Sequence, residues 1–391
     1  MTGLPKGRAA AGVEAVLRAL RIHAGPAALR HISRHGLQPQ DISTVAGAAG
    51  GPKGLILGPL DRFVFGHWLA GSAHLVHLVG ASIGAWRMAT ACLAQPVVAF
   101  ARLERDYIHQ HYDLQAGEKR PAAERVSALF GQNLAAFFGG QEARVLGHPR
   151  YRLHILASHG RQLLRTEHPW RTPLGYLGAY LSNAVHRRAL GAWLERVVFS
   201  SPGADLPFAS DDFPTRRVAL SAANFQPALQ ASCSIPFVLR SVTGIPGAPA
   251  GSYWDGGITD YHLHLNYAAR YHAIESRATS PITTGPTARN GLVLYPHFQQ
   301  AVVPGWLDKH LPWRHQATPF LDNMVLLAPD PDWVRRLPRG KLPDRTDFTY
   351  FGANLAARVQ AWQAASSASA QLADEFGAWL QRPDPALIQP L

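Results

Sequence analysis

The feature that most constrains the fold is a short apolar run that passes directly into a small-residue turn containing a serine. Residues 75–79 read Leu-Val-His-Leu-Val, and Gly80-Ala81-Ser82-Ile83-Gly84 follows at once. This pattern is typical of a strand that turns sharply into a helix and presents a serine hydroxyl at the turn. Bulky neighbours would collide with the strand and the helix, so Gly80 and Gly84 are expected to support the turn. Ser82 is therefore a candidate nucleophile.

The rest of the chain agrees with an α/β fold. With 391 residues and 47% hydrophobic content, it can bury a large core. Short apolar runs alternate with helix-compatible stretches, which favours a mainly parallel sheet. Apolar residues at three- and four-residue spacing predict helices, among others over 102–115, 179–196 and 350–381. The predicted strands are 42–46, 75–79, 153–157, 196–200, 217–221 and 292–295.

A glycine-rich loop lies upstream of Ser82. Residues 47–54 read Gly-Ala-Ala-Gly-Gly-Pro-Lys-Gly, between a predicted strand and a helix-compatible run. Such a loop aims backbone N–H groups at one point, and the helix N-terminus favours negative charge there. Because Pro52 has no N–H, the expected oxyanion donors are Gly50 and Gly51. A tight turn with only a structural role is the alternative.

Two nucleotide-binding interpretations of this loop fail. A phosphate-binding loop needs a serine or threonine directly after its lysine, whereas Gly54 follows Lys53 here. A dinucleotide loop needs Gly-x-Gly-x-x-Gly, which this segment lacks. We therefore expect no cofactor.

A third motif, Tyr253-Trp254-Asp255-Gly256-Gly257, follows much later in the chain. Alone, Asp-Gly is a common turn pair. The order of the three motifs, however, resembles the signature of the patatin-like phospholipases: Gly-Gly-x-Lys/Arg-Gly, then Gly-x-Ser-x-Gly, then Asp-Gly-Gly. Residues 231–239, Ala-Ser-Cys-Ser-Ile-Pro-Phe-Val-Leu, are similar to the small-residue stretch that these proteins carry before the aspartate. The resemblance covers roughly residues 40–265.

The resemblance implies a three-layer α/β/α sandwich around a mainly parallel sheet, and a Ser-Asp dyad in place of a triad. It makes Ser82 the nucleophile, Asp255 the base, and Gly50 with Gly51 the oxyanion donors. It also implies hydrolysis of carboxylic esters of lipids, of the phospholipase A, lysophospholipase or lipid esterase type. Lys53, Gly54, Gly256 and Gly257 would support the site. The chain departs from the family pattern at Ala48 and Ala49, where glycine is usual, and at Lys53, where arginine is more frequent.

In such a dyad the aspartate must take the serine proton itself. A carboxylate with an ordinary pKa of about 3.9 is a poor base for an alcohol at neutral pH. Burial beside apolar neighbours such as Trp254 is expected to raise the pKa of Asp255.

Two other functions stay open. One is a catalytically silent binding protein that keeps the patatin fold. The other is an α/β-hydrolase esterase with a Ser-His-Asp triad, although no His-Gly-Gly-Gly motif precedes the serine. We expect no metal site, because His262 and His264 are not accompanied by a ligand cluster. The downstream histidines are His262, His264, His272, His297, His310 and His315.

The sequence predicts a catalytic domain over residues 1–300, with residues 301–391 packed on it as a Trp-, Pro- and Arg-rich segment followed by helices. Residues 279–289 read as a surface loop. The aromatic residues around the C-terminal segment are expected to pack against the main body rather than to form a lid or acyl groove. They are Phe298, Trp306, Trp313, Phe320 and Trp333.

The chain is basic, with 38 Lys and Arg against 26 Asp and Glu, a formal charge of +12. No nucleic-acid recognition motif accompanies this charge, so we expect no nucleic-acid partner. Peripheral binding to an anionic membrane fits the ester-hydrolase interpretation better, and a merely solvated basic surface is the alternative. Two cysteines imply no disulfide framework. With no signal-like N-terminus and no apolar run of eighteen residues, we expect a cytoplasmic protein.

Overall fold

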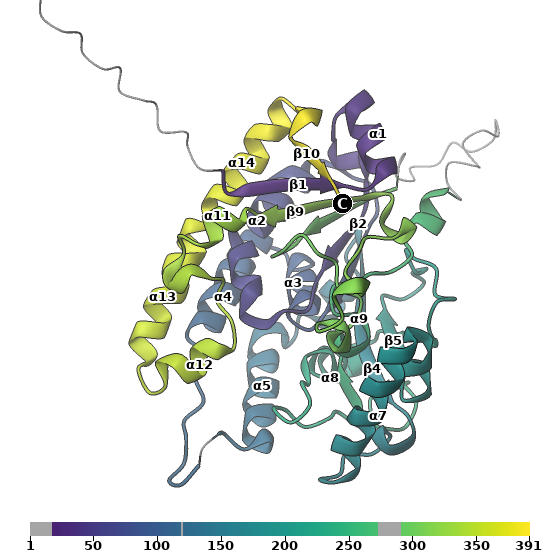
Figure 1. Cartoon of the computed structure of the whole chain (residues 1–391), viewed down its shortest axis with the longest axis vertical. Helices are drawn as coiled ribbons and strands as arrows, with labels where there is room; N and C mark the ends of the chain where they lie inside the picture. The colour runs from purple at the N-terminus through teal and green to yellow at the C-terminus, as the bar shows by residue number, and fades with distance from the viewer. Residues whose placement is uncertain (1–17, 119, 273–290) are drawn as a thin grey trace, which may run out of the picture.

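The computed structural model describes residues 18–118, 120–272 and 291–391 (Figure 1). Its centre is a ten-stranded mixed sheet with the order β10-β1-β9-β8-β2-β3-β4-β5-β6, and β7 pairs with β4 outside this order. The strands are β1 (Leu20–Ala24), β2 (Ile42–Gly47), β3 (Val76–Ala81), β4 (Tyr151–Gly160), β5 (Leu194–Ser200), β6 (Thr215–Ala219), β7 (Tyr253–Asp255), β8 (Leu292–Pro296), β9 (Met324–Pro329) and β10 (Ile388–Pro390).

The sheet is mainly parallel. Strands β9, β8, β2, β3 and β4 run parallel to one another, and β1 with β10 and β5 with β6 are also parallel pairs. The pairs β1 with β9, β4 with β5, and β4 with β7 are antiparallel. This confirms the predicted α/β class, and a strand overlaps each of the six predicted strands, although β6 ends at Ala219, two residues before the predicted end at 221. Strands β1, β7, β9 and β10 were not predicted. Because β2 and β3 are parallel neighbours, the glycine-rich loop and the Ser82 turn both follow carboxyl ends at the same edge of the sheet.

Helices cover both faces of the sheet. Tyr253 belongs to the large hydrophobic core and Trp254 to a smaller one, and successive residues of a strand point to opposite faces. Helix α7 packs over the smaller core, and α3 and α8 contribute to the larger one. The helices are α1 (Pro26–His35), α2 (Gly58–Phe63), α3 (Ile83–Ala91), α4 (Pro96–Ile108), α5 (Ala123–Phe138), α6 (Glu142–Leu146), α7 (Arg171–Val185), α8 (Ala222–Cys233), α9 (Gly257–Asp260), α11 (Pro331–Val334), α12 (Thr346–Phe351), α13 (Leu355–Ala368) and α14 (Ala370–Gln381).

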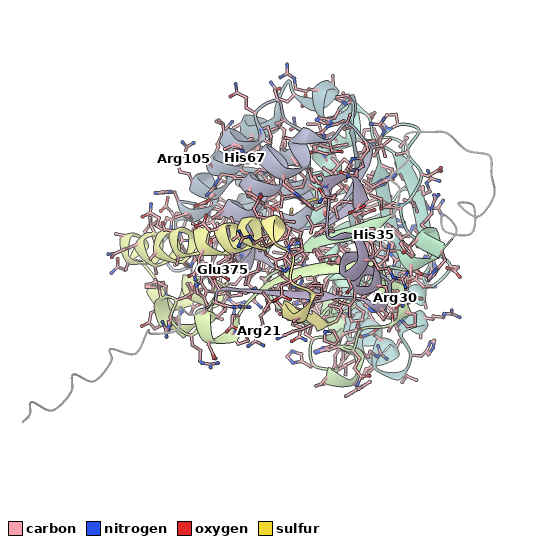
Figure 2. All side chains as sticks on the ribbon, turned by 90° about the horizontal axis from the view of Figure 1, so that it is seen from above. Arg21, Arg30, His35, His67, Arg105 and Glu375 are labelled. Atoms are coloured by element: carbon pink, nitrogen blue, oxygen red, sulfur yellow. The ribbon has the colours of Figure 1, made fainter. Side chains whose placement is uncertain are left out.

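Residues 301–391 do more than pack on the rest of the chain, because they supply β9 and β10 to the same sheet. Helix α14 is joined to the start of β1 through Glu375, whose carboxylate accepts hydrogen bonds from the Ala19 and Leu20 amides at 2.9 to 3.0 Å (Figure 2). The first and last elements of the described chain thus lie together at one side of the sheet (Figure 1).

The predicted helix boundaries need correction. The helix predicted over 102–115 begins earlier, at Pro96, and ends at Ile108. The helix predicted over 179–196 is interrupted: α7 ends at Val185, the backbone is extended at His186, a 3-10 helix covers Arg187–Ala192, and β5 begins at Leu194. The single long helix predicted over 350–381 is three helices, α12 to α14. The loop predicted at 279–289 lies outside the described residues.

Within residues 18–118, 120–272 and 291–391, no helix combines the length and the apolar content needed to cross a bilayer. Cys92 and Cys233 are both buried free thiols.

Candidate active site

Ser82 occupies the sharp turn between β3 and α3. Its backbone has φ 55° and ψ −130°, a strained conformation for a residue with a side chain. The turn also approaches the glycine-rich loop closely: a Cβ on Gly84 would lie 1.8 Å from the carbonyl oxygen of Gly47. A Cβ on Gly80 would lie 2.5 Å from the Cα of Ala85. The glycines on either side of Ser82 are therefore required by packing, as the motif predicts.

Strand register brings Asp255 to Ser82. Strand β4 pairs with β5 along one edge from His154 to Gly160, so both β3 and β7 must use its other edge. There β3 ends where Ala81 pairs with Leu156. At the next position of β4, Ala157 pairs with Asp255, the last residue of β7. The residue after β3 and the last residue of β7 consequently meet.

The two side chains form a direct hydrogen bond. Ser82 Oγ donates to Asp255 Oδ2 at 2.7 Å, and both side chains are buried. The second carboxylate oxygen, Oδ1, accepts from the Gly257 amide at 2.7 Å. The space around these glycines is filled: a Cβ on Gly257 would lie 2.6 Å from that of Ala49, and one on Gly256 would lie 2.1 Å from the Leu156 oxygen. A side chain at Gly257 would also press on the carboxylate, because its Cβ would lie 2.9 Å from Asp255 Oδ1.

The segment that precedes β7 holds both members of the pair. The Ser82 amide donates to Ser232 Oγ at 2.9 Å, and that hydroxyl donates to the Leu156 carbonyl at 2.6 Å. The Asp255 amide donates to the Ser234 carbonyl at 2.9 Å, and the Gly256 amide to the Ser232 carbonyl at 3.1 Å. The sequence indicated the segment 231–239 as a whole but not the role of Ser232, which fixes the turn at Ser82 through its hydroxyl.

Burial raises the pKa of Asp255 from 3.8 to about 6. The hydrogen bond from Ser82, the positive charge of Arg345 and the hydrogen bond from Gly257 act in the opposite direction but do not cancel it. A carboxylate with this pKa is a better proton acceptor than an exposed aspartate and is still ionised at neutral pH.

This pKa predicts the acid limb of an activity profile. Below about pH 6 Asp255 holds a proton and cannot accept the one on Ser82, so kcat/KM for an ester should fall about tenfold per pH unit. Above about pH 7, kcat/KM should no longer change with pH. Initial rates on a short-chain p-nitrophenyl ester between pH 4.5 and 8.5, with circular dichroism at each pH, would measure this. A profile unchanged down to pH 4.5 would contradict the proposed base.

The pair opens into a cavity of about 220 Å³. Gly50 lines it together with Ser82, and a Cβ on Gly50 would lie 2.4 Å from the Phe298 ring. Gly51, with φ 57°, has its Cα facing Arg345 and Tyr107, and Gly54 packs against Ile83. The cavity is lined by Ala49, Gly50, Lys53, Ser82, Ile235, Pro236, Asp255, Gly257, Ile258, Tyr261, Trp306, Lys309, Asp344, Arg345 and Thr346.

Three cationic side chains border this cavity. Lys53, predicted as part of the loop, has Nζ 5.2 Å from the centre of the Phe298 ring, and Lys309 has Nζ 5.0 Å from that of Tyr261. Burial lowers the pKa of both lysines. The third is Arg345, whose charge lowers the pKa of Asp255. Sequence reasoning missed Lys309 and Arg345, because they follow Asp255 in the chain without a motif and only folding brings them to the site.

The aromatic residues of the C-terminal segment divide between packing and the cavity. Phe298 and Trp333 are buried in the large core and Phe320 packs against it, as expected. Trp306 packs against both cores and also lines the cavity. Trp313 is exposed, so the packing predicted for it is wrong.

The histidines whose contacts are described bond away from the dyad. His262 accepts from the Val303 amide at 3.0 Å, His264 lies 3.2 Å from the Thr318 hydroxyl, and His315 bonds the Asp308 carbonyl at 2.9 Å. The position that an imidazole would occupy in a triad, against Ser82 Oγ, is taken by Asp255. In the described residues, no group of three or more His, Cys, Asp or Glu side chains is arranged to hold a metal ion.

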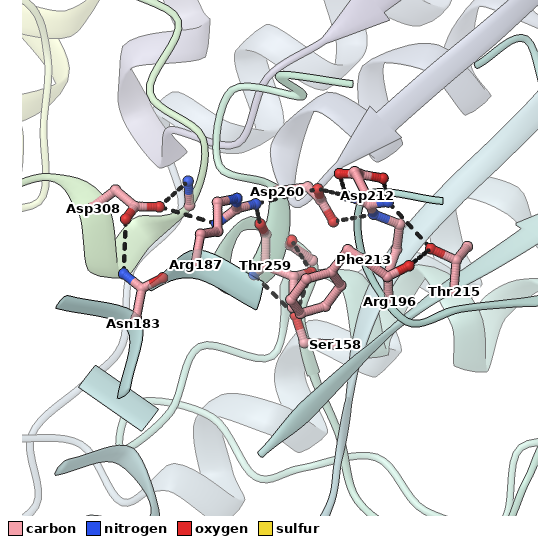
Figure 3. Close-up of polar contacts among 12 residues, drawn as sticks. Ser158, Asn183, Arg187, Arg196, Asp212, Phe213, Thr215, Thr259, Asp260 and Asp308 are labelled. Carbon is pink, nitrogen blue, oxygen red and sulfur yellow. Dashed lines mark hydrogen bonds and ion pairs between the residues drawn. The ribbon is translucent and has the colours of Figure 1, made fainter. Parts of the chain in front are cut away.

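A buried ion-pair network fixes the turn that follows Asp255 (Figure 3). Asp260, at the end of α9, accepts two hydrogen bonds from Arg196 of β5, at 2.6 and 2.8 Å, and both side chains are fully buried. Arg187 lies 3.0 Å from Asp308, two residues after Trp306. Arg187 also lies 3.8 Å from Asp260, so the network links α9 to the sheet and to the segment that carries Trp306 and Lys309.

No protein-family model matches the chain, and the comparison with curated proteins found no similar sequence.

Proposed function

We propose that this protein is a serine hydrolase that cleaves carboxylic ester bonds of lipids, with Ser82 as nucleophile and Asp255 as general base. One observation carries the proposal: in a strained strand-to-helix turn, a buried serine hydroxyl donates a 2.7 Å hydrogen bond to a carboxylate with a raised pKa. Strain and perturbed pKa values of this kind gather at functional sites.

The proposed reaction has two halves. Ser82 Oγ adds to the ester carbonyl carbon while its proton passes to Asp255 Oδ2. The developing oxyanion is stabilised by the Gly50 and Gly51 amides and by the N-terminus of α3. The C–O bond to the alcohol then breaks, Asp255 returns the proton to the leaving oxygen, and an acyl-serine is left. Water repeats the sequence, giving a carboxylic acid and free Ser82.

The walls of the cavity support a substrate that is apolar at one end and anionic at the other. Ile235, Pro236 and Trp306 offer apolar surface beside the dyad. Lys53, Lys309 and Arg345 offer positive charge within the same cavity, which suits a phosphate or carboxylate group. An acyl chain on the first surface and an anionic head group on the second would place an ester between them.

The experiment that tests this proposal is hydrolysis of a panel of defined esters by the purified protein. The panel holds short-chain p-nitrophenyl esters, a triacylglycerol, and phospholipids with neutral and anionic head groups, and released acid is measured by mass spectrometry. We expect release from p-nitrophenyl esters and from at least one lipid class. A folded sample that leaves the whole panel intact would refute the proposal.

A further inference from the structure

The surface of α7 carries a row of large apolar side chains. Trp170 directly precedes the helix, and Leu174, Leu177, Leu181 and Val185 lie within it. Each of the five is between 54% and 86% exposed. Figure 1 shows α7 at the periphery of the molecule, on the side away from α13 and α14.

Helical geometry gathers these residues on one face. At 100° per residue, positions 170, 174, 177, 181 and 185 fall within an arc of about 80°. The buried positions, which include Thr172, Tyr176 and Ala179, lie on the opposite side. After Arg171 the helix contains no charged residue. A helix with one face in the core and a second apolar face towards solvent is unusual for a water-exposed surface and marks a contact site.

A second exposed apolar group lies next to the cavity, beside the core-facing side of α7. Phe237, which is 61% exposed, packs edge-on against Tyr176 of α7 with ring centroids 5.8 Å apart, and its neighbour Val238 is exposed as well. The two preceding residues, Ile235 and Pro236, line the cavity that holds the dyad. Exposed apolar side chains therefore lie on α7 and also next to the cavity that holds Ser82.

The charges at the borders of this surface favour one kind of partner. Arg171 is exposed at the beginning of α7, and Arg188 is exposed just beyond its end. Together with the overall charge of +12, this arrangement suits an anionic lipid surface. Leucines flanked by a tryptophan and by cations are typical of helices that lie in a membrane interface.

We infer that the apolar face of α7, with Phe237 and Val238, docks the protein on an anionic lipid membrane and presents the cavity to it. This inference rests on the proposed lipid-ester hydrolysis, because a lipid substrate has to pass from the membrane to Ser82. Lipid leaving the bilayer would move over Phe237 and past Pro236 into the cavity.

The test compares Leu177→Asp/Leu181→Asp with the matched control Val98→Asp/Leu114→Asp. The control residues are 62% and 56% exposed, lie outside this surface and add the same negative charge. Co-sedimentation with phosphatidylcholine vesicles containing phosphatidylglycerol measures binding, and p-nitrophenyl butyrate hydrolysis measures the dyad without a membrane. We expect the α7 variant to lose vesicle binding by about tenfold or more, since two apolar contacts are replaced by charges. The control should bind like the parent, and all three should hydrolyse the soluble ester equally.

Several outcomes would overturn the docking surface: a parent that does not bind vesicles, an α7 variant that binds like the parent, or a control variant that loses binding equally. If the α7 variant instead changes only from dimer to monomer in light scattering, a second copy of the chain covers this face and the inference is wrong. Vesicle binding lost only in the α7 variant, with no soluble-ester hydrolysis in the parent, would support the docking surface and count against the proposed function.

Discussion

Replacing Ser82 with alanine is expected to reduce ester hydrolysis by about 10⁶-fold, to the background rate, while the protein stays folded. Loss of the attacking oxygen removes the covalent pathway, and nucleophile deletions in serine hydrolases have effects of this order. Only the hydroxyl oxygen is removed, but Asp255 loses a buried hydrogen bond, so the free energy of unfolding should fall by about 1 to 3 kcal/mol.

The measurement is p-nitrophenyl butyrate hydrolysis by purified parent and variant, with thermal unfolding followed by circular dichroism. Ser43→Ala is a suitable control, because Ser43 lies in β2 towards the opposite end of the strand from the glycine-rich loop and its hydroxyl bonds only the Leu292 carbonyl among the described contacts, at 3.3 Å. The control should keep the parent rate. Parent-like hydrolysis by a folded Ser82→Ala protein would remove Ser82 from the mechanism.

Replacing Asp255 with asparagine is expected to lower kcat by about 10⁴-fold, the scale seen when the acidic member of a catalytic group is neutralised. The amide oxygen can still accept from the Gly257 amide, so the turn should be kept. It cannot take a proton from Ser82, so attack on the ester loses its base.

The check is the same assay, with Asp113→Asn as a control at a carboxylate that is 97% exposed. The remaining activity of Asp255→Asn should also lose the acid limb near pH 6 that the parent is expected to show. If Asp255→Asn kept both the rate and the limb of the parent, another group would have to be the base.

The sequence predicted the elements that carry local signals. Five of the six predicted strands, β2, β3, β4, β5 and β8, are almost fully buried inside the sheet, where burial on both faces leaves a continuous hydrophobic pattern. The sixth, β6, is the exposed edge strand, and its bounds differ from the predicted ones by two residues. The four strands that were not predicted lack a long, purely apolar run or lie in a region of mixed composition. Strands β7 and β10 have three residues each, and β1 includes Arg21 and His23. Strand β9, Met324–Pro329, is fully buried, but prolines, tryptophans and basic residues surround it.

The candidate site likewise contains residues that a local sequence pattern indicates and residues that only folding brings together. Ser82, Asp255 and the glycines have signals in the sequence, because a tight turn and a close approach restrict which residues can occur. The meeting of Ser82 with Asp255 depends on both β3 and β7 pairing with the same edge of β4, which no local pattern encodes. Lys309 and Arg345 reach the cavity through contacts of the C-terminal segment, and neither side chain has a local pattern that would indicate this.

The central claim, that Ser82 is a nucleophile activated by Asp255, is tested most directly by labelling the folded protein with a fluorophosphonate and mapping the modified peptide by mass spectrometry. We expect one adduct, on Ser82, which is absent from Ser82→Ala and forms far more slowly in Asp255→Asn. A folded parent that stays unlabelled, or carries its adduct on a different residue, would contradict the claim.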